Sequence, residues 1–334
     1  MKWSRAITIG FWFIAALFGL LLSIFVAISY GAKEMTLGTV WDAVFRFDRS
    51  LASHLIVHEL RLPRVLGAVC TGMAFAVAGA IMQGVTRNSM ADTGILGVNA
   101  GAAFVVALCF AFLPGLSYAS LMAMSFVGAL LSTLFILLLG TAAPGGLSSL
   151  TLTIAGAVTS AILHSLSAGV AIYFGLNQDL AFWYAGGVAG VKWEHLRWLA
   201  PIVAAAVVWA FLLGRSITFL SLGDETAVNL GVRTTLTKVL AMTAAVVLAG
   251  ASVSVAGSIS FVGLVVPHIA RKLVGVDYRL VIPMSGILGA VLLVCADFAS
   301  RMVNPPRELA IGAMVALVGV PFFLYLARKE RREL

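Results

Sequence analysis

Long unbroken runs of apolar residues dominate the chain, and short polar connections separate them. A helix needs about 20 apolar residues to cross the hydrocarbon core of a bilayer. Runs that approach or reach this length predict membrane-spanning helices at Ile7–Ile28, Leu66–Gln83, Ile95–Leu113, Tyr118–Leu139, Leu150–Phe174, Leu199–Leu213, Val239–Ala256, Leu280–Phe298 and Leu309–Leu326. The pattern therefore predicts an all-α integral membrane protein.

One more apolar segment, Phe261–Ala270, is too short to cross a bilayer by the usual criterion. Without it there are nine spans and the termini lie on opposite sides; with it there are ten. The basic tail 328–332 favours ten spans, because cytoplasmic ends carry an excess of Lys and Arg. We expect about ten spans, with both termini cytoplasmic.

The composition agrees with this class. The 334 residues are 61% hydrophobic and 11% charged, with a mean hydropathy of +1.05. Ten spans with short connections leave no room for a soluble domain, so we expect a single transmembrane domain over 1–334. Basic loop ends account for the net charge of +8 without nucleic acid. The three cysteines lie in apolar runs without CxxC spacing, which predicts buried thiols rather than disulfides or a metal site.

Several kinds of chemistry are missing from the sequence. It contains no GxxxxGK[ST] phosphate loop, no HExxH motif and no GxSxG elbow, so we expect neither an enzyme nor an ATP site of its own. A proton-coupled carrier needs ionisable groups at membrane depth. The spans hold almost none, and the chief exception, Asp297, lies four residues before Arg301, where helical ion pairing accounts for it.

Four segments carry a more specific pattern. They are Arg61–Arg64; Gly79–Gln83 with Arg87–Asp92, Leu96–Gly97 and Gly101–Ala102; Leu222–Ala227 with Leu230–Gly231; and Gly257–Arg271 with Gly275–Arg279, Ala296–Asp297, Arg301, Pro306, Glu308–Leu309 and Pro321–Phe323. In this order they strongly resemble the FecCD family, the permeases of iron-siderophore and cobalamin ABC importers. The chain departs from the family at Ser89 and Thr93, where proline is usual or frequent, which leaves the local turn geometry open.

The resemblance implies a type II importer permease in the bacterial cytoplasmic membrane. Its partners would be a second permease subunit, in a homo- or heterodimer, two cytoplasmic ATPase subunits that bind ATP and Mg, and an extracytoplasmic siderophore-binding protein. It implies no cofactor and no metal ligand in this chain. In relatives the short segment corresponding to Phe261–Ala270 is a membrane helix shielded by its neighbours, which supports ten spans.

Basic residues are unusually frequent on the predicted outer side: Arg46, Arg49, Arg61, Arg64, Arg301 and Arg307. Arg61 and Arg64 are three residues apart and so project to the same side of a helix. The resemblance implies that Arg61, Arg64 and Arg301 dock glutamates of the binding protein. Interfacial anchoring or contact with lipid phosphate is the alternative.

A loop at about 216–235 is predicted on the cytoplasmic side and contains a short helix. Acidic residues begin this helix and a glycine ends it. The resemblance makes it the coupling helix that docks on the ATPase, through Leu222, Gly223, Asp224, Glu225, Ala227, Leu230 and Gly231. A bare amphipathic interfacial helix would look much the same.

A stripe of polar and small residues follows one face of the fifth predicted span: Ser149, Thr153, Gly156, Ser160, His164 and Ser167. It could hold helices together. Because the fifth helix of similar permeases lines the translocation path, we expect a weakly polar path wall. We expect His164 to bind no iron, since an intact chelate needs no metal removal.

The leading hypothesis is thus a permease for ferric siderophores, with haem and cobalamin as alternatives inside the family. Hypotheses from other classes are a proton-coupled secondary transporter and a membrane scaffold that transports nothing.

Overall fold

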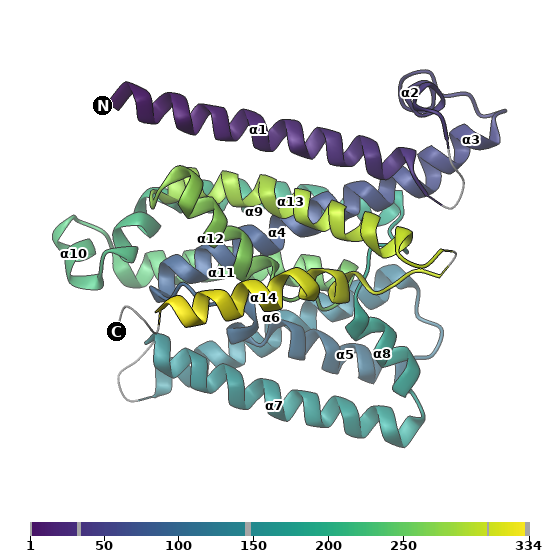
Figure 1. The fold of residues 1–334 in the computed structure, drawn as a ribbon. Helices are drawn as coiled ribbons and strands as arrows, with labels where there is room; N and C mark the ends of the chain where they lie inside the picture. Colours follow the sequence, from purple (N-terminus) through teal and green to yellow (C-terminus); the bar gives the residue numbers. More distant parts are fainter. Residues whose placement is uncertain (1, 32–34, 144–147, 306, 331–334) are drawn as a thin grey trace.

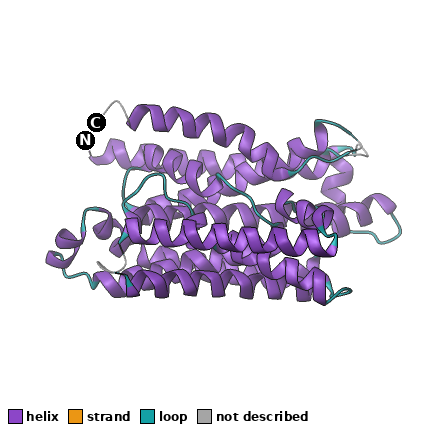
Figure 2. Cartoon of the chain, turned by 90° about the horizontal axis from the view of Figure 1, so that it is seen from below, coloured by secondary structure: helices purple, strands orange, loops and turns teal. Residues whose placement is uncertain are grey.

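The computed structural model describes residues 2–31, 35–143, 148–305 and 307–330. Over these ranges the chain forms helices and loops, without a strand (Figures 1 and 2). The long helices run roughly parallel or antiparallel in one bundle (Figure 1). The start of the first helix and the end of the last lie at the same end of this bundle, here called the terminal end; the opposite end is called the far end.

Seven of the described helices are long and apolar enough to cross a membrane. They are α1 (Lys2–Ser29), α4 (Leu62–Thr86), α6 (Tyr118–Ala142), α7 (Ser149–Phe174), α9 (Trp193–Ser221), α11 (Thr234–Ala256) and α13 (Tyr278–Met302). Three shorter helices lie among them: α5 (Val98–Phe112), α12 (Val262–Val274) and α14 (Ile311–Glu330). All nine predicted runs fall on these helices, and Phe261–Ala270 falls on α12.

The remaining helices are short. The apolar pattern did not predict them, except for the short helix expected in the loop at about 216–235. At the far end lie α2 (Leu37–Phe45), α3 (Ala52–Leu55), the π-helix η1 (Ile56–Arg61) and α8 (Asn177–Ala185). At the terminal end α10 (Asp224–Asn229) projects from the bundle (Figure 1). The 3-10 helix η2 (Thr93–Leu96) precedes α5. Short apolar runs give a weak signal because they fall below spanning length.

The helix α4 lies at the centre of the bundle, where neighbouring helices cover it. Buried residues make up 78% of its most apolar stretch, compared with 11% for α1 and 17% for α7. Small residues allow this packing: a Cβ built on Gly72 would collide with the carbonyl oxygen of Gly289 on α13, and one on Gly79 with that of Gly263. Close approach through glycine is how membrane helices gain contact without a hydrophobic force between them.

The turn between α4 and α5 contains Thr93, one of the two positions whose local geometry the sequence left open. Thr93 donates its backbone N–H to Asp92 Oδ1 at 2.7 Å. Proline at this position would have no N–H to donate. The side chain of Asp92 thus fixes the start of η2 by a bond that a proline at position 93 could not make.

The three cysteines are free, but they are not all buried. Cys109 is buried, Cys70 is half-buried and Cys295 is exposed on α13. The prediction of a buried thiol is therefore wrong for Cys295. An apolar run identifies a helix, whereas the side of that helix that faces outward depends on its neighbours.

Candidate functional site

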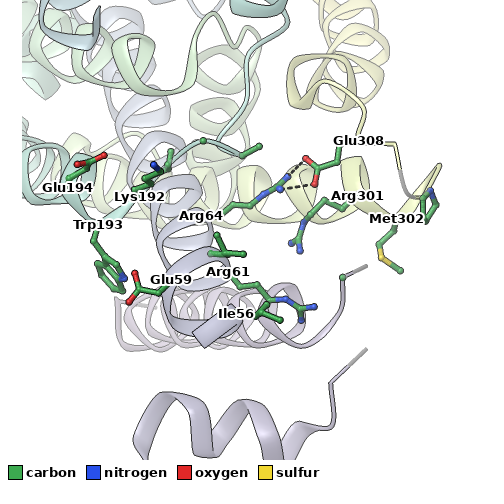
Figure 3. A pocket seen from close by; sticks show the side chains of 16 residues that line it. Ile56, Glu59, Arg61, Arg64, Lys192, Trp193, Glu194, Arg301, Met302 and Glu308 are labelled. Carbon is green, nitrogen blue, oxygen red and sulfur yellow. Dashed lines mark hydrogen bonds and ion pairs between the residues drawn. The ribbon is translucent and has the colours of Figure 1, made fainter. Parts of the chain in front are cut away.

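The far end of the bundle holds a cavity of about 1060 Å³, here called the far-end cavity (Figure 3). Four parts of the chain meet there: the loop after α1, the η1–α4 junction, the start of α9 and the end of α13 with the loop that follows. Its charged lining residues are Glu59, Arg61, Arg64, Lys192, Glu194, Arg301 and Glu308. The three arginines predicted to act together therefore line one cavity.

Arg61 is buried and reaches the end of α1. Its Nη1 donates to the carbonyl oxygens of Ile28 at 2.6 Å and Ser29 at 2.9 Å. Helices end with carbonyl groups that lack a partner within the helix, and cationic side chains stabilise such ends. Arg61 therefore serves as a cap for α1. Although it lies three residues before Arg64, the two side chains run to different helices.

Arg301 caps the same helix end from α13. Its Nη2 donates to the carbonyl oxygen of Ala27 at 3.1 Å, and its Nη1 to that of Tyr30 at 3.2 Å. Together the two arginines bond the carbonyls of residues 27–30. Gly31 leaves room for them, because a Cβ there would lie 3.0 Å from Arg61 Nη2 and 3.6 Å from Arg301 Nη1.

Arg64 connects α4 to α13 and to the loop that follows α13, through one carboxylate in each. Its Nε donates to Asp297 Oδ1 at 2.8 Å, and its two terminal nitrogens bond Glu308 at 2.8 and 2.9 Å (Figure 3). The fork-shaped hydrogen bonding with Arg64 holds the pKa of Glu308 below its usual value. The second oxygen of Asp297 lies 3.1 Å from Arg301 Nη2. The predicted pairing of Asp297 with Arg301 is confirmed, and Arg64 is an additional partner.

Other residues of the cavity escaped the sequence reasoning. Lys192 is exposed at the start of α9. Trp193, next to it, donates its indole N–H to the carbonyl oxygen of His58 at 2.8 Å, which ties α9 to η1. A Lys-Trp-Glu sequence before an apolar run is a signal of a helix entering a membrane interface, although it does not reveal which other segments lie beside it.

A second surface lies at the terminal end, on α10. Leu222, Val228 and Leu230 are each more than half exposed, whereas Ala227 is fully buried. The predicted short helix is thus present, with Gly223 and Gly231 in positive-φ conformations before and after it. Val228 completes its exposed apolar side, although the sequence reasoning did not include it.

The first residue of α10 anchors the helix to the bundle. Asp224 Oδ2 lies 2.8 Å from Lys238 Nζ on α11 and 3.9 Å from Arg87 Nη2 at the end of α4. Glu225, beside it, is exposed. An acidic residue in the first turn also suits the positive end of the helix dipole. The apolar side of α10 is therefore held outward from a fixed base.

The predicted stripe on α7 does not share one environment. Gly156 is buried against the carbonyl oxygen of Ile95, and Ser167 is buried with its hydroxyl bonded to the carbonyl oxygen of Leu163 at 2.7 Å. Ser160 is half-buried, whereas Thr153 and His164 are exposed. Part of the stripe thus packs inside the subunit; the side chain of Ser149 lies outside the described residues.

His164 has one polar contact within the subunit. Its Nδ1 lies 3.0 Å from the hydroxyl of Tyr184 on α8. This contact joins α7 to α8 near the far end, and burial raises the pKa of the Tyr184 phenol. Among the described residues no group of three or more His, Cys, Asp or Glu side chains could hold a metal ion.

Comparison with known proteins gives a family and a fold. The profile of the FecCD transport family matches residues 19–329. An iron(3+)-hydroxamate import permease of Bacillus subtilis, FhuB, is 50% identical over 321 residues, which cover 96% of this chain and 84% of that protein. The iron-uptake permease FeuB of the same organism is 40% identical, over 99% and 98% of the two chains.

A more distant relative and a solved structure extend the comparison. The hemin transport permease HmuU of Yersinia pestis is 35% identical over 91% of both chains. A metal-chelate type ABC transporter, solved in an inward-facing conformation, superposes with a TM-score of 0.82 at 25% identity. The match covers 95% of this chain and 98% of that one.

Proposed function

Because the chain belongs to the FecCD transport family, we propose that it is the membrane-spanning permease subunit of an ABC importer for ferric siderophore complexes. The observation that carries the proposal is the 50% identity, over 96% of this chain, to a permease for iron(3+)-hydroxamate. The chain is a transport subunit rather than an enzyme, and a multi-pass protein of the bacterial cytoplasmic membrane. Separate subunits supply the ATPase activity with its ATP and Mg.

The proposed topology has ten spans, with both termini in the cytoplasm. Seven long helices and the shorter apolar helices α5 and α14 give nine, and α12, which is short and largely buried among its neighbours, would be the tenth. The positions of the first and last helix ends favour an even number, because an odd number would put them at opposite ends (Figure 1). The basic tail favours a cytoplasmic terminal end. The far end then faces outward.

We assign the far-end cavity as the dock for the extracytoplasmic binding protein. Arg61, Arg64 and Arg301 present guanidinium groups to one cavity, and the exposed Lys192 adds a charge at its side. Their internal bonds orient these groups before a partner arrives, which lowers the cost of ordering them on binding. Acidic side chains from the partner could then use the remaining N–H donors.

We assign the exposed side of α10 as the dock for the ATPase. Leu222, Val228 and Leu230 offer an apolar surface on a helix that is anchored by Asp224. Such a surface suits a groove on a cytoplasmic partner. Asp224 lies within ion-pair distance of Arg87 at the end of α4 and of Lys238 on α11. A movement of α10 would therefore be transmitted directly to these two helices.

The translocation path would lie between α7 and a second permease subunit, identical or related. The helix α7 lies at the edge of the bundle, and Thr153 and His164 on it are exposed. An edge helix that exposes a hydroxyl and an imidazole is suited to a weakly polar wall. Gly156, Ser160 and Ser167 would position this helix against its own subunit rather than touch the substrate.

Haem is the second candidate substrate, because a hemin permease is 35% identical. The decisive experiment is uptake by cells that express the permease with its ATPase and binding protein. We expect radiolabelled ferric hydroxamate to accumulate in an ATP-dependent way, and haem and cobalamin to remain near background. Uptake of haem or cobalamin without ferric siderophore would contradict the substrate assignment. Uptake that persists without the ATPase would contradict the ABC assignment.

The two docks can be tested separately. Replacing Arg61 and Arg64 by glutamate should abolish binding-protein docking, whereas Arg197→Glu, a charge reversal at an exposed residue of α9 that does not line the cavity, serves as a control. Leu222→Asp or Leu230→Asp should stop the ATPase from co-purifying. Docking at wild-type affinity in the first variant, or undiminished co-purification and uptake in the second, would refute the corresponding assignment.

A further inference from the structure

The short helix α2 leaves one apolar side uncovered. Val40 and Ala43 are fully buried, and they face α1, α3 and η1. The uncovered side consists of Leu37, Trp41, Val44 and Phe45, which are 56%, 56%, 40% and 66% exposed. Thr39 and Asp42 occupy the third side of the helix and are half-buried. In water, so many large apolar side chains on nine residues would be unfavourable.

The helix α2 lies at the level where α1 would leave the bilayer. Residues 30–36 connect it to α1, and an extended segment of that length reaches at most about 25 Å. In Figure 1 the helix lies level with the far end of α1, on the side away from the rest of the bundle, and is seen nearly end-on while α1 is seen side-on. Its axis therefore runs across the membrane-spanning direction.

Two arginines follow the uncovered side directly. Arg46 ends α2, and Arg49 lies in the next turn; both are exposed. No described carboxylate forms an ion pair with either of them. The nearby acidic groups are Asp42 on the third side of α2 and Asp48, which accepts hydrogen bonds from Ser50. Aromatic side chains beside free cationic groups are typical of helices at the headgroup level of a membrane.

A second permease subunit would not cover this side. The proposed path wall α7 and the helix α2 lie at opposite edges of the bundle (Figure 1). A second subunit that faces α7 would therefore leave the apolar side of α2 uncovered. The lipid that surrounds α1 would extend to α2. Only 11% of the most apolar stretch of α1 is buried within the subunit.

We propose that α2 is an interfacial anchor that lies in the outer leaflet, with its uncovered side among the acyl chains and with Arg46 and Arg49 on lipid phosphates. The inference depends on the chain crossing a membrane and not on what it transports. The bilayer is the occupant because the helix combines an apolar side, a polar side and basic residues with a position beside a spanning helix.

The test uses a nitroxide label at single cysteines in a variant whose three natural cysteines are alanine and whose uptake is intact. The permease is reconstituted in vesicles of phosphatidylethanolamine and phosphatidylglycerol at 3:1. Collisions with oxygen, which concentrates in hydrocarbon, are compared with collisions with a water-soluble nickel chelate. Labels are placed at Trp41 and Phe45, at Val44 in a protein that keeps both aromatic side chains, and at Thr39 on the third side of the helix. Leu212 on α9, which is 73% exposed, is the lipid reference, and the exposed Ser50 is the water reference.

We expect the labels at 41, 44 and 45 to favour oxygen, as the label at 212 does, and the label at 39 to shift toward the nickel chelate. Access of the chelate to 41, 44 and 45 at the level of position 50 would overturn the proposal. Protection of these positions only after the binding protein is added would overturn it too, in favour of a protein contact. Raising the phosphatidylglycerol fraction should increase the oxygen preference, and Arg46→Gln with Arg49→Gln should remove that increase; equal responses would refute the phosphate contacts.

Discussion

Arg64 Nε lies 2.8 Å from Asp297 Oδ1, and this ion pair joins the central helix α4 to α13 in a nearly buried place. Asp297 also faces Arg301, so one carboxylate balances two guanidinium groups. We expect Asp297→Asn to cost about 3–5 kcal/mol of unfolding free energy, because it leaves buried positive charge uncompensated. The free energy of unfolding, measured in detergent for wild type and variant, tests this expectation. Asp48→Asn, at an exposed turn, is the matched control and should change little; equal losses would contradict the pairing argument.

The second carboxylate of this cluster predicts a dependence on pH. Hydrogen bonding with Arg64 lowers the pKa of Glu308 below its ordinary 4.5. A group whose pKa is lowered in the folded state stabilises that state above its unfolded pKa, and this contribution is lost as the pH falls through the folded value. We expect wild-type Tm to exceed that of Glu308→Gln at pH 7, and the difference to shrink below about pH 4.5. A constant difference down to pH 3 would refute the prediction.

The contact of Gly72 with Gly289 predicts sensitivity to a single methyl group. Gly72→Ala would place its Cβ against the carbonyl oxygen of Gly289, so we expect α4 and α13 to separate and the Tm to fall. Gly169→Ala on α7 is the control, because its Cβ would meet nothing within 4 Å. Alanine is the better helix former by about 1 kcal/mol, so the control should be neutral or stabilising. Similar losses in both variants would contradict the close approach.

The anchor of α10 predicts a loss of coupling without a loss of stability. The pair of Asp224 with Lys238 is partly exposed and should contribute less than about 1 kcal/mol. We expect Asp224→Lys to leave the Tm nearly unchanged but to lower transport-coupled ATPase activity. Adding Lys238→Asp restores an opposite-charge pair and should recover part of that activity. Failure of the double variant to exceed the single one would argue against the anchor.

Some residues of the proposed path wall on α7 are exposed and others are buried, so we expect substitutions there to have two different kinds of effect. Thr153→Leu and His164→Leu change exposed side chains, so we expect uptake to fall several-fold while the Tm stays close to wild type. Gly156→Leu changes a buried contact with Ile95 and should lower the Tm. Uptake and thermal unfolding measured on the same preparations distinguish the classes. A fall in Tm in all three variants would show that α7 only packs and does not line a path.

The sequence was most informative where lipid, rather than another segment, determines the structure. An apolar run predicts a spanning helix whatever its neighbours are, so the long helices and the position of α12 followed from hydrophobicity together with the charge of the tail. The pairing of Asp297 with Arg301 followed too, because it lies within one helix turn.

Long-range geometry was out of reach for one sequence. Arg61 and the carbonyl it bonds in Ile28 are 33 residues apart, and Arg64 and Asp297 are 233 apart. Nothing in the spacing of either pair indicates a contact. The helix α2 was missed for another reason: Leu37, Trp41 and Phe45 recur every four residues, a signal of an amphipathic helix that a search for spanning lengths passes over.

The caps at the end of α1 also constrain how the chain can be built during translation. This helix leaves the ribosome well before α13 does, yet the carbonyls of Ala27 and Tyr30 accept hydrogen bonds from Arg301 on that later helix. A nascent chain that stops before α13 should therefore hold α1 in the bilayer with a frayed C-terminal end, and crosslinking of arrested chains can follow the ordering of that end. We expect α1, although it is inserted before α13, to reach its final structure only once α13 has packed against it.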